Sequence, residues 1–240
     1  VINKGITEEE ILSGVKLAFE GKWDRVKLYF MLGLPTETEE DIEGIADLAG
    51  KIVSQWHNIP KENRSRDLRV TVSTSFFVPK PFTPFQWCAQ TEYQSYMDKQ
   101  QFLNSKIYNK KIQYHCHDAF LSTLEGLLAR GDRRTGRLIY AAWKHGCRFD
   151  SWSDLFKEEA WRAAIEETGT ELSYYCYRER KEDEVFPWDH IDVGVTKQFL
   201  YREYQNGLQG KVTPNCRQHC SGCGVRTLAD SGVCYEVKAE

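Results

Sequence analysis

The segment at residues 27–41 constrains the fold more than any other part of this chain. It reads KLYFMLGLPTETEED, and residues 26–34 are apolar almost without interruption and without period-two alternation. This pattern is typical of a strand that is covered on both faces. Gly33 and Pro35 then end the strand in a tight turn.

A helix should follow this turn. Thr36 and Thr38 can each act as its N-cap, because Glu39 and Asp41 stand three residues later and complete a capping box. A strand that leads through a Gly/Pro turn into a capped helix is half of a parallel β-α-β unit, where ligands bind at the C-terminal ends of strands. The buried stripe of the helix should be Ile42, Ile45, Leu48, Ala49 and Ile52.

The run YFMLGLPTET at residues 29–38 resembles the turn after the fifth barrel strand of radical S-adenosylmethionine (radical SAM) enzymes. In that family a Cys-x3-Cys-x2-Cys loop after the first strand holds the catalytic [4Fe-4S] cluster. No cysteine precedes Lys27 in this chain. The resemblance therefore implies a piece of the barrel that follows the cluster loop.

The next expected strand occupies residues 68–78. A second stretch with the same resemblance follows it at residues 79–87. It reads PKPFTPFQW, and its three prolines favour an extended segment. It closely resembles the sequence after the sixth strand in an uncharacterised radical SAM subfamily, some of whose members carry a cobalamin-binding-type domain upstream. Residues 124–134 and 141–152 resemble the C-terminal extension of that subfamily.

We therefore expect an α/β fold made of the last units of a partial TIM-type radical SAM barrel, a mostly α-helical extension and a Cys-rich metal-binding tail. These three parts should occupy residues 1–87, 88–210 and 211–240. Further helices are predicted at residues 3–21, 91–106, 119–130, 138–145, 153–168 and 196–208, with a short extended piece at 111–115.

Four of the eight cysteines crowd into the last 25 residues: Cys216, Cys220, Cys223 and Cys234. Short spacing of this kind favours a metal or iron–sulfur site over a disulfide framework. Three interpretations remain open: a structural zinc site, an auxiliary iron–sulfur cluster, and the catalytic cluster. The first three cysteines have the spacing of the catalytic loop but follow the barrel instead of opening it.

The resemblance also implies a function for the intact protein. A reduced [4Fe-4S] cluster would deliver an electron to S-adenosylmethionine (SAM) and cleave it to methionine and a 5′-deoxyadenosyl radical, which abstracts hydrogen from an unknown substrate. By analogy, Met31, Gly33, Leu34, Pro35 and Val78 would line the adenosine site. Without the cluster loop this chain should be inactive alone, and its partner would be the missing N-terminal half of the barrel.

A zinc-binding helical module that binds proteins or nucleic acid is the alternative hypothesis. Trp87, Trp143 and Trp152 could then stack on bases, although the net charge of −3 weighs against a nucleic-acid partner.

No run of about 18 apolar residues occurs, which argues against a membrane span. The chain starts with Val and shows no signal peptide, so we expect part of a cytoplasmic protein. Open sheet edges could pair copies into a homo-oligomer.

Overall fold

The computed structural model describes residue 2 and residues 4–225. The chain divides into two units, each with its own hydrophobic core. The first unit comprises residues 1–77 and 93–119, and the second comprises residues 78–92 and 120–240. No helix in the described part of the chain combines the length and apolar character needed to cross a membrane.

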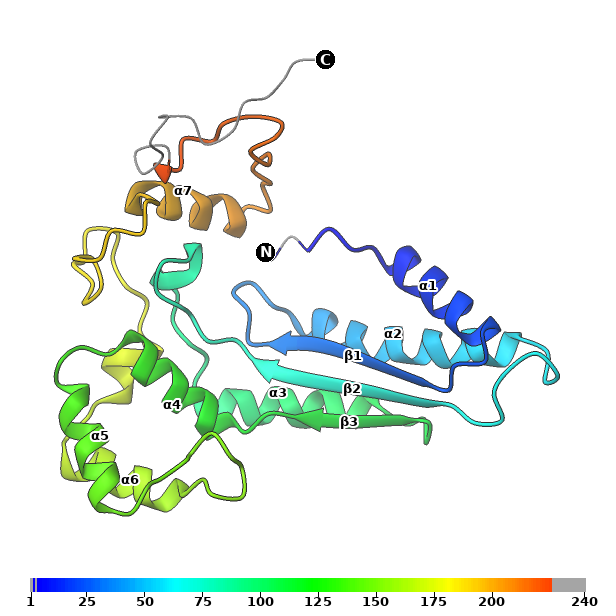
Figure 1. Cartoon of the computed structure of the whole chain (residues 1–240), viewed down its shortest axis with the longest axis horizontal. Coiled ribbons are helices and arrows are strands. Elements are labelled where there is room, and N and C mark those ends of the chain that lie inside the picture. Colours follow the sequence, from blue (N-terminus) through cyan, green and yellow to red (C-terminus); the bar gives the residue numbers. More distant parts are fainter. Residues whose placement is uncertain (1, 3, 226–240) are drawn as a thin grey trace. The chain divides into compact units, whose positions relative to one another are not determined.

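A small parallel sheet forms the centre of the first unit. Its strands are β1 (Arg25–Leu32), β2 (Arg69–Phe76) and β3 (Ile112–Cys116), hydrogen-bonded in the order β1-β2-β3. Helix α2 (Glu39–Asn58) connects β1 to β2, and α3 (Tyr93–Lys106) precedes β3. This arrangement, which Figure 1 shows, confirms the α/β class.

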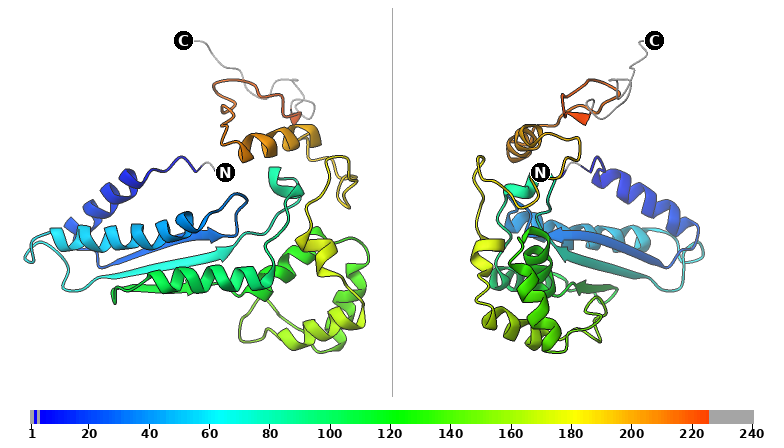
Figure 2. Two further views of the ribbon diagram at one scale, coloured as in Figure 1. Left: turned by 180° about the vertical axis from the view of Figure 1, so that it is seen from behind. Right: turned by 60° about the vertical axis from the view of Figure 1, so that its left-hand side comes forward.

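Helices α2 and α3 lie on the same face of the sheet, as the front and back views show (Figures 1 and 2). Helix α1 (Glu8–Glu20) packs against α2. The predicted stripe of α2 is confirmed, since all five residues are at most 9% exposed. The buried residues of β2 that face the helices include Val70 and Val72, both 0% exposed.

The expectation that β1 is covered on both faces is wrong for this chain. Its residues alternate between exposed and partly buried, and Tyr29 is 73% exposed. The reason is that α2 and α3 both cover one face, and no helix in the described part of the first unit covers the other. A run of apolar residues cannot reveal this, because it records hydrophobicity and not which face receives a helix.

Capping boxes start the first two helices. Thr7 and Glu10 cap α1, so this helix begins at Glu8 and not at residue 3 as predicted. In α2 the cap is Thr38, whose side chain accepts a hydrogen bond from the Asp41 N–H while its own N–H donates to the Asp41 carboxylate at 2.8 Å. Of the two caps that the sequence allowed, the structure selects Thr38.

The predicted domain boundary after residue 87 differs from the division in the structure. Residues 93–119 belong to the first unit because β3 extends the sheet beside β2. The Tyr96 side chain is fully buried and its hydroxyl donates to the Phe77 carbonyl at 2.5 Å, which fastens α3 to the end of β2. The chain therefore passes into the second unit after Phe77, contributes α3 and β3 to the first unit, and continues in the second unit after Ala119.

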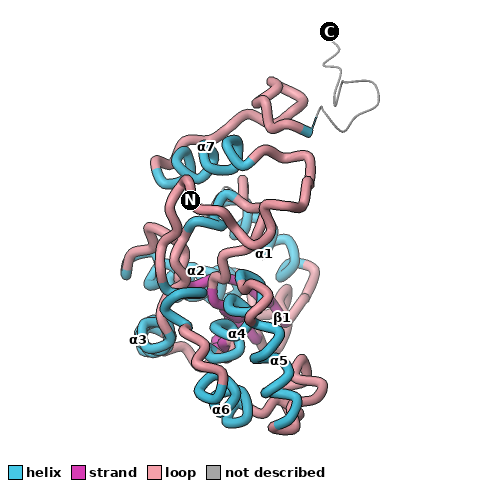
Figure 3. Tube along the Cα trace, turned by 90° about the vertical axis from the view of Figure 1, so that its left-hand side faces the viewer, coloured by secondary structure: helices cyan, strands magenta, loops and turns pink. Residues whose placement is uncertain are grey.

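Helices and loops make up the described part of the second unit (Figure 3). Its core includes Leu127, Leu138 and Ala164, all 0% exposed. The predicted helix at 153–168 starts later than expected, at Glu158. The elements of the unit are a 3-10 helix (Pro84–Trp87), α4 (Ala119–Arg130), α5 (Thr135–Lys144), α6 (Glu158–Glu167), a π-helical turn (Ser173–Tyr177) and α7 (Lys197–Leu208).

Replacing the α2 cap should destabilise the first unit. We expect Thr38→Ala to lower the free energy of unfolding by about 1 kcal/mol, measured by urea denaturation. Hydrogen bonds from the backbone of Thr38 and, second, from its side chain lower the pKa of Asp41 from its usual 3.8. The stability that these bonds give is present at neutral pH and is lost as the pH falls through the lowered pKa, and Thr38→Ala removes only the side-chain part. The control is Ser54→Ala in the same helix, where the hydroxyl only bonds back to the Gly50 carbonyl and its loss should be close to neutral.

Candidate functional site

The turn at the C-terminal end of β1 has an unusual backbone. Gly33 has a φ of +82°, which glycine adopts without a steric penalty. Thr36 has a φ of +68°, a conformation that is rare for a β-branched residue and concentrates at functional sites. The surrounding contacts must hold Thr36 in this state.

Glu37 supplies the contacts that hold the turn. Its carboxylate accepts the Gly33 N–H with both oxygens, at 3.0 and 2.9 Å, and pairs with the Lys99 ammonium of α3 at 2.8 Å. The side chain of Glu37 is only 7% exposed. The sequence analysis missed this residue, because nothing in the run of acidic residues distinguishes a buried carboxylate from the exposed ones that follow.

A cavity of about 490 Å³ opens beside this turn. This volume is in the range of small-molecule sites. Of the predicted site residues, Met31, Leu34 and Pro35 line the cavity. Gly33 is not among the lining residues, although its N–H bonds Glu37, which is, and Val78 lies in the second unit.

The open face of the sheet continues from this cavity. Ser75 of β2 lines the cavity and is the register partner of Met31. The next row on the same face joins Tyr29 to Ser73 and His115. Small polar side chains therefore follow β2 on the side without helices, whereas valines follow it on the side with helices.

The described cysteines of the tail do not form a metal site in this structure. Cys216 and Cys220 are exposed, Cys223 is half-buried, and Cys234 lies outside the described residues. Within residues 2 and 4–225, no group of three or more His, Cys, Asp or Glu side chains is placed to hold a metal ion. The predicted four-cysteine site thus stays a prediction.

The tryptophans of the alternative hypothesis occupy two environments. Trp87 is 0% exposed and packs against Phe186 and Tyr204, so it cannot stack on a base. Trp143 and Trp152 are 51% and 66% exposed. Sequence reasoning treated the three alike, because aromatic residues serve equally in a core and in a binding surface.

Comparison with known proteins gives one informative likeness. The chain is 30% identical over 138 residues to uncharacterized protein MJ0966 of Methanocaldococcus jannaschii, a match that covers 58% of this chain and 28% of the relative. The chain therefore spans less than a third of that protein. No model of a protein family matches the chain, and no solved structure matches it.

The bonds of Glu37 should matter for stability. We expect Glu37→Ala to lower the free energy of unfolding by about 1–3 kcal/mol, because it removes the largely buried carboxylate that accepts the Gly33 N–H. Lys99→Ala keeps the Gly33 bond but leaves the largely buried Glu37 carboxylate without its cation, so it should also destabilise the first unit. Urea denaturation measures both, with the exposed neighbour Glu40→Ala as the control. Equal losses in the glutamate variants would contradict this role for Glu37.

Proposed function

We propose that this chain is the C-terminal part of a radical SAM barrel and that its strand-end cavity forms one wall of the SAM site. The observation that carries the proposal is a parallel sheet with helices on one face only, in which the motif residues Met31, Leu34 and Pro35 line the cavity at the end of β1. The sequence resemblance at residues 29–38 and 79–87 supports the same assignment.

The uncovered face is the main argument for a barrel. Parallel sheets normally have both faces covered. In a TIM-type barrel the helices surround the outside and alternate side chains of each strand point into the interior. The face of Tyr29, Ser73 and His115 would be that interior, and the free edges of β1 and β3 would pair with the remaining strands of the missing N-terminal half.

The residues of the cavity fit the adenosine part of SAM better than its reactive end. Leu34 and Pro35 offer an apolar wall, and Thr36 and Ser75 add hydroxyl groups. When bound, SAM and a reduced [4Fe-4S] cluster would supply the radical chemistry. The cluster would be held by the missing half, because no cysteine precedes β1. The substrate is left unassigned.

The tail cysteines would hold a second centre. We propose zinc or an auxiliary iron–sulfur cluster at Cys216, Cys220, Cys223 and Cys234. The backbone N–H of Thr196, the cap of α7, donates to the Cys223 carbonyl at 2.8 Å, which places this part of the tail next to a helix terminus. The clustering of four thiols in the sequence is the support for the centre.

The proposal is tested by SAM binding and cleavage. The chain should bind SAM in calorimetry, and Leu34→Glu should abolish binding because a carboxylate replaces the apolar wall. Leu17→Glu is the control, since Leu17 is 68% exposed on α1. An anaerobically reconstituted intact protein should produce 5′-deoxyadenosine, and this chain alone should not. Cleavage by the chain alone would move the catalytic cluster to the tail, and no SAM binding by either protein would refute the function.

The nature of the tail centre is tested by metal analysis after anaerobic purification. A colourless protein with one zinc, lost in Cys220→Ala, would identify a structural clip. A brown protein with iron and sulfide, equally lost in that variant, would identify a redox centre. Cys116→Ala in β3 is the matched control and should retain the metal. A metal-free protein of normal stability would refute the proposed metal centre at the tail cysteines.

A further inference from the structure

The second unit contains a buried arginine with unused hydrogen-bond donors. Arg130, the last residue of α4, is 0% exposed, although arginine is almost never fully buried unless it is paired. Its Nη1 donates to the Cys176 carbonyl at 3.3 Å, whereas its Nε and Nη2 have no partner. Leaving charged donors buried without an acceptor is costly.

A second buried arginine lies against it. Arg180 is 5% exposed, its Nη2 donates to the Arg130 carbonyl at 3.2 Å, and its Nε has no partner. Burial, together with the nearby charge of Arg180, lowers the pKa of Arg130 to about 10. A guanidinium group keeps its proton at neutral pH, so both side chains are positively charged.

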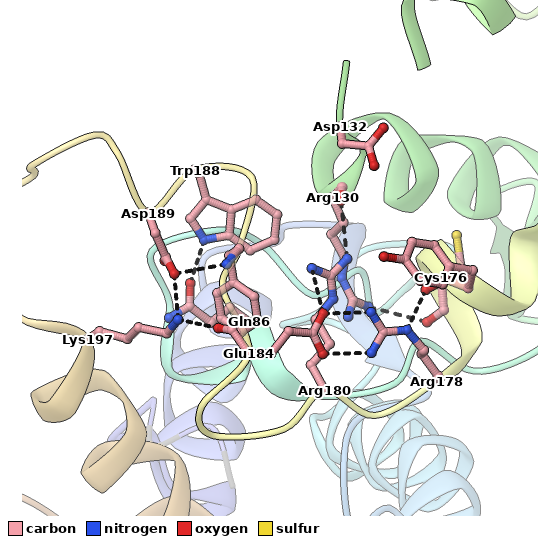
Figure 4. A network of polar contacts seen from close by, with 12 residues as sticks. Gln86, Arg130, Asp132, Cys176, Arg178, Arg180, Glu184, Trp188, Asp189 and Lys197 are labelled. Atoms are coloured by element: carbon pink, nitrogen blue, oxygen red, sulfur yellow. Dashed lines mark hydrogen bonds and ion pairs between the residues drawn. The ribbon is translucent and has the colours of Figure 1, made fainter. Parts of the chain in front are cut away.

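The two carboxylates that line the adjoining cavity, Glu184 and Asp132, already pair with other arginines, and Figure 4 shows the contacts of Glu184. Glu184 forms a two-pronged pair with Arg178 at 2.7 and 2.6 Å and lies 3.8 Å from Arg180. Asp132 pairs with Arg134, whose Nε donates to Oδ1 at 3.1 Å and whose Nη2 donates to Oδ2 at 2.5 Å. Within the described part of the chain, no acidic side chain forms an ion pair with Arg130.

A cavity of about 450 Å³ adjoins these arginines. Arg130 and Arg180 contribute to its wall, together with Arg133, Tyr174 and His190. The wall also carries the carboxylates of Asp132 and Glu184, which pair with Arg134 and Arg178. We propose that this cavity binds the oxyanion of a small molecule, a phosphate or carboxylate group, which pairs with Arg130 and Arg180. The planar forks of two guanidinium groups match the oxygens of such a group. The proposal does not depend on the radical SAM assignment.

The alternative is that the arginine pair only packs the core. The unpartnered nitrogens of Arg130 have no surface open to solvent, so the anion would have to enter as the side chain turns toward the cavity. If the pair only packs the core, an apolar residue of similar size should be tolerated or even stabilising. If the cavity binds an anion, the stabilisation that the anion gives should be lost when the positive charge of Arg130 is removed. The two cases differ in their response to added oxyanions.

Thermal unfolding in matched salts distinguishes the two cases. At constant ionic strength, replacing chloride by inorganic phosphate should raise the Tm of the wild-type chain in a saturable manner. Arg130→Met should weaken phosphate binding about tenfold or more and remove the rise. Arg137→Gln, which removes an exposed arginine of α5 outside the cavity, should retain it. Succinate in place of phosphate tests whether the site prefers a carboxylate. A larger rise in Tm with succinate than with phosphate assigns the site to carboxylates.

A wild-type chain that responds equally to phosphate, succinate and chloride would overturn the proposal. So would a rise that persists in Arg130→Met. If that variant does not fold, NMR of the wild-type arginine Nε–H groups replaces it. Phosphate should then shift a small set of these signals with one saturation curve, and uniform or absent shifts would refute the site.

Discussion

The parallel pairing of β1, β2 and β3 is the constraint on which the rest of the first unit depends. Adjacent parallel strands need crossover connections, and crossovers of one hand between strands in sequential order place their helices on one face. Helices α2 and α3 therefore bury the same side of the sheet. Within the described part of the first unit no helix covers the opposite side, and the cavity lies at the C-terminal end of β1 beside the turn of Gly33.

The turn at residues 33–37 connects the end of β1 to the candidate site. The Glu37 carboxylate bonds the Gly33 N–H and the Lys99 ammonium, so the strand end and α3 are held by one side chain. Thr36, which has a positive φ, lies between Gly33 and Glu37 and so within the segment that this hydrogen bond closes. A rigid turn at a strand end suits ligand binding, because ordered walls reduce the entropy lost on association.

The second unit presents a different kind of site. In the first unit the cavity has an apolar wall from Leu34 and Pro35, with hydroxyls beside it. In the second unit the cavity adjoins Arg130, which forms no ion pair within the described residues, and Arg180, which lies 3.8 Å from the Glu184 carboxylate. The two cavities thus suit different chemical groups, and their proposed ligands can be tested independently.

Local patterns determined much of this protein. Spacing and turn chemistry in the sequence predicted the strand, turn and helix at residues 26–52, the buried stripe of α2 and a cap at Thr36 or Thr38, because these depend on neighbours within a few residues. Only the tertiary structure decided that one face of β1 is open, that β3 joins the sheet, and that Glu37 and Arg130 are buried. These outcomes depend on contacts between distant segments, such as Glu37 with Lys99 and Arg130 with Cys176. Residue type alone does not specify such contacts, since most glutamates and arginines lie at the surface.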